Sequence, residues 1–186
     1  MSELIRSLEE VTAAFDRLTI PYAVMGGLAV RAHGLPRPTY DVDFTIAIER
    51  PELPGLMDEL EDMGYTVPEI YRSGWVDRVA EMPLFKFCLM IGGNSIAVDV
   101  FLAETDFLRS ALQRRLRAEI DGVTVNVVSP EDLILLKMIA RRPRDIGDII
   151  DVRFAQGDLD ETYLREWAGR LKIAERFDEI WRETAP

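Results

Sequence analysis

The segment YAVMGGLAVRAHGLPRPTYDVDFTIAI, residues 22–48, decides the fold. Its first four residues form an apolar run typical of a buried strand, and Gly26 and Gly27 follow directly. Glycines at the end of a strand let the backbone turn sharply. They also bring free amides close to phosphate oxygens, because no side chain stands in the way. We therefore expect a phosphate-binding turn at residues 26–27.

Two acids follow this turn. Thirteen residues separate Gly27 from Asp41, Asp43 comes two positions later, and Arg37 and Thr39 stand just ahead. Side chains two apart on a strand share a face, so the two carboxylates can hold Mg²⁺ together. Two acids at a strand end are more often only a solvated turn, and the pair alone does not decide between these readings.

A third acid lies in a predicted hairpin. Residues 84–91 and 95–101 are apolar runs that flank Gly92-Gly93-Asn94, a pattern typical of a β-hairpin. Asp99 lies within the second run, where an unpaired charge is costly and needs a metal, a cation or a hydrogen-bond network. Together with the glycine turn and the first acid pair, Asp99 favours the metal-binding interpretation.

A second informative segment is SPEDLILLKMIARRPRDIGDIID, residues 129–151. Ser129, then proline, then two acids predict a helix start. Lys137 lies on the apolar part of this helix, where a lysine either extends to solvent or reaches a phosphate. Asp145 and Asp148, three apart, share a face of the next helix. They could pair with Arg141 or Lys137, or stabilise the helix N-terminus through its dipole.

These segments resemble the nucleotidyltransferase fold of the DNA polymerase β superfamily. Residues 26–44 and 129–151 are similar to a small bacterial branch that includes the AbiEii-type toxin nucleotidyltransferases. Lincosamide and aminoglycoside nucleotidyltransferases are similar in their first half. The resemblance spans roughly residues 20–155. It implies an α+β fold, a mixed β-sheet flanked by helices, with a C-terminal helical extension.

The resemblance also implies an activity, the transfer of a nucleoside monophosphate from an NTP to a hydroxyl group. Asp41, Asp43 and Asp99 would bind the metal, two Mg²⁺ ions with Mn²⁺ as the alternative. These three aspartates and Lys137 are the expected catalytic residues, with Asp99 accepting the proton of the attacking hydroxyl. The expected nucleotide-binding residues are Gly26, Gly27, Arg37, Thr39, Lys137, Asp145 and Asp148. The acceptor would be tRNA, a protein or an antibiotic-like small molecule.

Two other functions stay open at this point. The chain could keep the fold and bind a nucleotide or a partner without catalysis. It could also be the toxin of a toxin–antitoxin pair, with an antitoxin protein as partner. The presence of all three acids favours an active enzyme over a silent one.

Composition limits the remaining alternatives. The net charge is −11, which argues against non-specific binding of nucleic acid by the whole surface. Two basic clusters oppose this average, at residues 109–117 and 137–144. We expect the first to be a solvated helix face and the second to take part in binding.

The single histidine and the single cysteine limit metal and redox chemistry. One histidine, His33, excludes a multi-histidine zinc site, and Cys88 is expected to be a buried, inert thiol.

The coarse organisation follows from periodicity and turn residues. We predict a nucleotidyltransferase core over residues 1–128 and a helical region over 129–186 that packs on it, in a cytoplasmic protein without a membrane segment. Residues 65–83 read as irregular, either shaping the substrate pocket or only connecting two strands. The predicted helices cover residues 3–18, 27–33, 51–63, 105–115, 130–140 and 144–157 and two short segments within 160–184. We expect the apolar residues of the last two segments, Leu171 and Ile173 among them, to be buried. The predicted strands cover residues 22–25, 41–48, 84–91, 95–101, 118–120 and 123–128.

Overall fold

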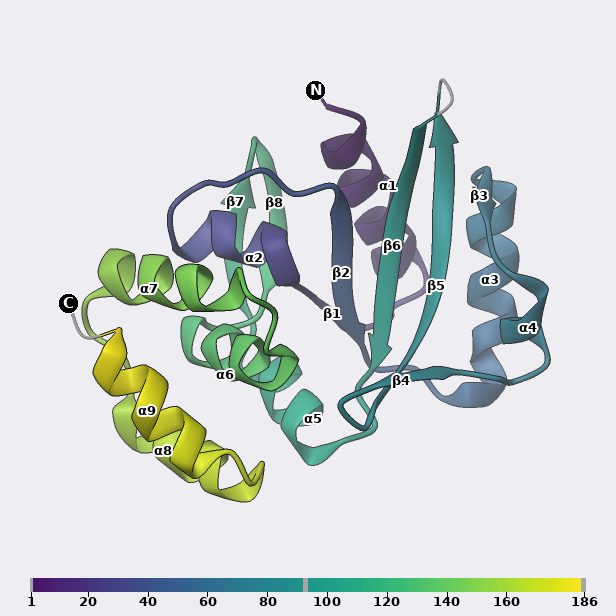
Figure 1. Ribbon diagram of the computed structural model, residues 1–186. Helices are drawn as coiled ribbons and strands as arrows, with labels where there is room; N and C mark the ends of the chain where they lie inside the picture. The colour runs from purple at the N-terminus through teal and green to yellow at the C-terminus, as the bar shows by residue number, and fades with distance from the viewer. Residues whose placement is uncertain (1, 92–93, 185–186) are drawn as a thin grey trace.

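The computed structural model describes residues 2–91 and 94–184 and shows one mixed β-sheet with helices on both faces (Figure 1). The helices are α1 (Glu3–Arg17), α2 (Gly26–His33), η1 (Arg50–Glu52), α3 (Leu53–Asp62), α4 (Glu69–Arg72), α5 (Asp106–Gln113), α6 (Pro130–Ala140), α7 (Asp145–Gln156), α8 (Glu161–Arg170) and α9 (Ala174–Glu183). The strands are β1 (Tyr22–Met25), β2 (Asp41–Ile46), β3 (Tyr65–Thr66), β4 (Asp77–Val79), β5 (Met82–Ile91), β6 (Asn94–Leu102), β7 (Leu116–Ile120) and β8 (Val123–Val127). The predicted α+β fold is confirmed.

The sheet has the strand order β3-β5-β6-β2-β1-β8-β7, with β4 paired to β5. β2 runs parallel to β6, and β1 runs parallel to β8, while the other pairs are antiparallel. The predicted hairpin is present as β5 and β6, although its turn residues, Gly92 and Gly93, lie outside the described residues. β2 thus lies at the centre, between β6 and β1, which is where its acids are best shielded from water.

One face of the sheet is covered by α1. Its buried residues Leu4, Leu8, Val11 and Phe15 recur every three to four positions and form one stripe along the helix. Phe15 meets the Phe44 ring of β2 edge-on, with ring centroids 5.2 Å apart. This packing supports β2 from behind, on the face opposite to its acids.

The other face is covered by α2, α6 and α7, with α8 and α9 packed outside them (Figure 1). The Ser129 hydroxyl accepts a hydrogen bond from the Asp132 amide at the start of α6, as predicted for a cap. Buried residues before and after position 128 belong to one hydrophobic cluster. The division into a core and a helical region at that position stays a prediction. No helix among residues 2–91 and 94–184 is both long and apolar enough to cross a bilayer.

Three expectations about local structure were wrong. The segment 65–83 is not irregular, because β3 and β4 both pair with β5, and such long-range pairing leaves no mark on the local sequence pattern. Cys88 is half-buried, since it shares the less covered face of β5 with Lys86. Leu171 and Ile173 were expected in the core but are partly buried at the connection between α8 and α9.

Candidate active site

Four neighbouring strands place one row of residues side by side. Met25 of β1 stands opposite Asp43 of β2, Asp43 opposite Asp99 of β6, and Asp99 opposite Lys86 of β5. Asp41 lies two residues before Asp43 and so shares its face of the sheet. The three predicted acids therefore gather on one face, that of the helices α2, α6 and α7.

The glycine turn is adjacent to this row and leaves room for it. Gly26 has a φ of +65°, and a Cβ atom there would lie 1.8 Å from Asp43 Oδ2. A Cβ atom on Gly27 would lie 2.4 Å from Thr39 Oγ1. Neither position can carry a side chain without moving these groups. The two glycines thus have a packing role that the sequence did not reveal, and their phosphate-binding role stays a prediction.

Asp43 is the most perturbed acid of the site. The residue is 9% exposed, and burial together with repulsion from Asp41 and Asp99 raises the pKa of its carboxyl group to about 6. Lys137 and Arg142 act in the opposite direction, but they do not compensate. A strongly charged cation beside the three carboxylates would relieve this repulsion, so the donor set suits a hard, oxygen-binding metal ion.

Two of the acids have partners of their own. The Lys86 ammonium donates to Asp99 Oδ2 at 2.5 Å, and the Thr39 hydroxyl donates to Asp41 Oδ1 at 2.8 Å. Within residues 2–91 and 94–184, no three acids, histidines or cysteines stand together in a metal-binding arrangement. Metal binding by all three aspartates therefore requires their side chains to rearrange. Lys86 was not predicted as a residue of the site, although its position opposite Asp99 in the predicted hairpin could have indicated this contact.

A buried ion-pair network lies beside the acids. The Lys137 ammonium is 2.6 Å from Asp148 Oδ2 and 3.4 Å from Asp145 Oδ1. Arg37 forms two hydrogen bonds to the Asp148 carboxylate, at 2.5 and 2.9 Å. Burial alone would raise the pKa of Asp148, but these donors outweigh it and lower that pKa. Of the partners considered for the two aspartates, Lys137 is therefore the one found.

Asp145 also holds the connection between α6 and α7. Its Oδ2 accepts a hydrogen bond of 2.7 Å from the Arg142 amide, which lies three residues before α7, and stabilisation of the helix N-terminus through its dipole stays a prediction. In the described part of the chain, Asp145 Oδ1 has no hydrogen-bond partner. It lines a small cavity of about 50 Å³ whose wall also includes Gly26, Asp43, Lys137 and Arg142. This cavity joins the glycine turn, Asp43 and the ion-pair network, and its lining includes Arg142 of the second basic cluster.

The remaining candidates have structural explanations. His33 Nε2 lies 2.7 Å from the Val128 carbonyl oxygen, and burial lowers the pKa of its imidazole, so it tethers α2 to the end of β8. In the first basic cluster, Arg114 is not simply solvated, because it pairs with Glu131 and Asp132. Both contacts stabilise the start of α6.

Comparisons with known proteins agree with this geometry. Residues 1–176 match the family described as "Nucleotidyltransferase of unknown function (DUF6036)". The chain belongs to this family. It is therefore a nucleotidyltransferase, as the acids and the glycine turn predicted. The AbiEii-type branch stays a prediction, and no curated protein matches the chain.

Solved structures share the nucleotidyltransferase fold. An antigenic nucleotidyltransferase-like protein from Paracoccidioides brasiliensis is 25% identical with a TM-score of 0.55, over 81% of this chain and 75% of its own. The ANT(2″)-Ia structure with adenylyl-2″-tobramycin is 19% identical with a TM-score of 0.60, over 92% and 98%. The lincomycin-bound lincosamide adenylyltransferase LnuA is 14% identical with a TM-score of 0.52, over 82% and 97%.

The first prediction concerns the glycine turn. Gly26→Ala should destabilise the protein by about 2 to 4 kcal/mol, since alanine is strained at this φ and its Cβ collides with Asp43. Gly55→Ala is the control, because no atom lies within 4 Å of a Cβ there and α3 tolerates alanine. Chemical denaturation measures both changes. Equal stability of the two variants would show that the turn has no such constraint.

The second prediction concerns the charge of Asp43. Its folded pKa of about 6 exceeds the ordinary value of 3.8, so its ionisation costs stability, and this cost appears as the pH rises from about 4 to above 6. The free energy of unfolding of Asp43→Asn should therefore exceed that of wild type by about 1 to 3 kcal/mol at pH 8 in EDTA. The difference should disappear near pH 4. Denaturation at the two pH values tests this, and a pH-independent difference would contradict it.

Proposed function

We propose that this nucleotidyltransferase uses Mg²⁺ to transfer a nucleoside monophosphate from an NTP to a hydroxyl group. The observation that carries this proposal is the strand register that sets Asp43 beside Asp99, next to the Gly26 turn. Such a juxtaposition of acids and a helix start is suited to a metal-bound triphosphate. The presence of all three acids also favours activity over the silent alternative.

Asp41, Asp43 and Asp99 would hold the metal, as two Mg²⁺ ions or as Mn²⁺ in their place. When bound, these cations supply charge stabilisation for the attacking and leaving oxygens. Asp99 Oδ2, once released from Lys86, is placed to accept the proton of the acceptor hydroxyl. Lys86 would hold the Asp99 carboxylate in position until then through their ion pair.

The start of α2 would bind the triphosphate. Met25 at its N-cap makes no side-chain cap bond, and the first turn contains no acid, so the amides there face a ligand without an internal competitor. Thr39 and Arg37 flank this turn, and Lys137 and Arg142 line the cavity beside it. Asp145 and Asp148 would act by holding Lys137, rather than by touching the nucleotide themselves.

The acceptor is the open part of this proposal. The solved structures with adenylyl-2″-tobramycin and with lincomycin are of enzymes that take antibiotics, which favours a small hydroxyl compound here. The experiment incubates the protein with each α-labelled NTP and with candidate acceptors, and follows where the label goes. Label on tRNA or on a protein side chain would identify one of those as the acceptor instead. The cytoplasmic location, the toxin role and an antitoxin partner stay predictions.

The third prediction tests metal-dependent NTP binding. Mg²⁺ and NTP together should raise the melting temperature, because a ligand that binds only the folded state stabilises it. Neither ligand alone should do so to the same extent. The double variant Asp41→Asn, Asp43→Asn should lose this rise. If the double variant keeps the full rise in melting temperature, Asp41 and Asp43 do not bind the metal and the NTP.

The fourth prediction concerns Lys137. Lys137→Met keeps the side-chain volume but removes the charge, and it should lower NTP affinity or turnover at least about tenfold, as for loss of one charge-assisted phosphate contact. Arg165→Met is the control, since the ion pairs of Arg165 are exposed. If both variants, measured on their folded fraction, lower NTP affinity and turnover equally and only slightly, the role of Lys137 is purely structural.

A further inference from the structure

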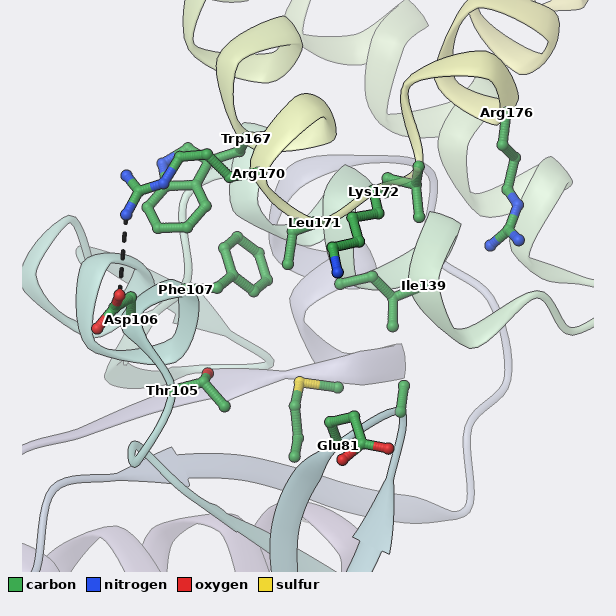
Figure 2. Close-up of a pocket in the computed structure, with 13 residues that line it drawn as sticks. Glu81, Thr105, Asp106, Phe107, Ile139, Trp167, Arg170, Leu171, Lys172 and Arg176 are labelled. Carbon is green, nitrogen blue, oxygen red and sulfur yellow. Dashed lines mark ion pairs between the residues drawn. The ribbon is translucent and has the colours of Figure 1, made fainter.

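A second, larger cavity opens beside the acids. It has a volume of about 530 Å³, and its apolar wall is formed by residues such as Phe107, Trp167 and Leu171 (Figure 2). This volume is sufficient for a small organic molecule. Met82 lines both this cavity and the small one that contains Asp43. The two spaces are therefore neighbours on the same face of the sheet.

Three cations face this larger cavity. They are Arg170, Lys172 and Arg176, against the two acids Glu81 and Asp106. The excess of positive charge is local, since the chain as a whole carries −11. A cavity with this balance attracts an anion and repels a polycation.

The cations differ in how far they are already engaged. The Arg170 guanidinium lies 3.9 Å from the centroid of the Trp167 ring and 4.0 Å from Asp106. Arg176 donates one hydrogen bond of 2.9 Å to the Met138 carbonyl oxygen. Within residues 2–91 and 94–184, Lys172 forms no side-chain hydrogen bond or ion pair. Lys172 is thus the cation with most capacity for a ligand.

The backbone is unusual on two sides of the cavity. Lys172 has a φ of +58°, and Ala80 and Glu81, in the turn between β4 and β5, have φ values of +49° and +65°. Both conformations belong to tight connections: Lys172 directly follows the C-cap of α8, and Ala80 and Glu81 form the two-residue turn of the β4–β5 hairpin. Figure 2 shows the Lys172 side chain directed into the cavity.

We propose that this cavity binds the acceptor, and that the acceptor is a hydroxyl compound that carries a phosphate group. The inference rests on the proposed function and specifies its substrate class. The phosphate would meet Lys172, while the apolar part of the acceptor packs on Phe107 and Leu171. A polycation such as tobramycin, the compound in the ANT(2″)-Ia structure, does not match this lining.

The transfer step balances with the NTP as the second reactant. The acceptor oxygen forms a bond to the α-phosphorus, and the bond from that phosphorus to the bridging oxygen of the β-phosphate breaks. Pyrophosphate leaves, and the hydroxyl proton goes to Asp99. No oxidant or reductant is needed.

The fifth prediction concerns matched pairs of probes: glucose and glucose 6-phosphate, ribose and ribose 5-phosphate, and glycerol and glycerol 3-phosphate. Calorimetric titration without NTP or Mg²⁺ should show binding of at least one phosphorylated member, at least tenfold tighter than its neutral partner. Glucosamine and tobramycin should bind no better than glucose. If none of the phosphorylated probes binds, or if the cationic probes bind as well, the proposal is wrong.

Substitutions then locate the binding. Lys172→Gln should weaken binding of the phosphorylated probe at least tenfold, Lys172→Arg should retain it, and Arg165→Gln, on an exposed face of α8, should leave it unchanged. Unchanged binding in Lys172→Gln would overturn the assignment. The double variant Asp41→Asn, Asp43→Asn separates this proposal from the proposed function, since it should bind the probe normally even though it transfers no nucleotide. Loss of probe binding in that variant would also contradict a separate acceptor cavity.

Discussion

Burial of the Asp43 carboxylate is the constraint on which the site depends. The group lies on a central strand, next to a second acid on the same strand and a third on the neighbouring one. Water is largely removed from it, and the charges around it are mostly of its own sign, so its pKa rises to about 6. A fold that accepts this cost at its centre concentrates negative charge where a cation can be bound.

The surroundings of Asp43 follow from this constraint. Gly26 has to lack a side chain because Asp43 occupies the space a Cβ would need. The compensating cations are not placed on Asp43 itself: Lys86 pairs with Asp99, and Lys137 and Arg37 pair with Asp148. Buried pairs of this kind are costly to break on one side only, which keeps the charged groups in fixed positions around the acids.

The acids and the proposed acceptor cavity lie on different parts of the chain. The acids and the glycine turn lie on the central strands, whereas the larger cavity is formed mainly by the turn after β4, the start of α5 and the connection between α8 and α9. Solved structures that share this fold contain adenylyl-2″-tobramycin in one case and lincomycin in another. In this chain the cavity lining, with Lys172 at its edge, points to a different charge class.

The sequence by itself determined the features that depend on local physics. The strand before Gly26, the hairpin around Asp99 and the cap at Ser129 follow from alternation, turn residues and hydrogen bonding between near neighbours, and each was predicted. The sequence also singled out Asp41, Asp43 and Asp99, whose metal-binding role is implied by the family resemblance and stays a prediction. Only the tertiary structure decided what depends on register and on distant contacts: the alignment of Asp43 with Asp99, the pairing of Lys86, and the bond of Arg37 to Asp148, 111 residues away. Those contacts are set by the sheet order and by helix packing, because a strand carries no local signal of its partner and a buried charge takes whichever counter-charge the fold brings to it.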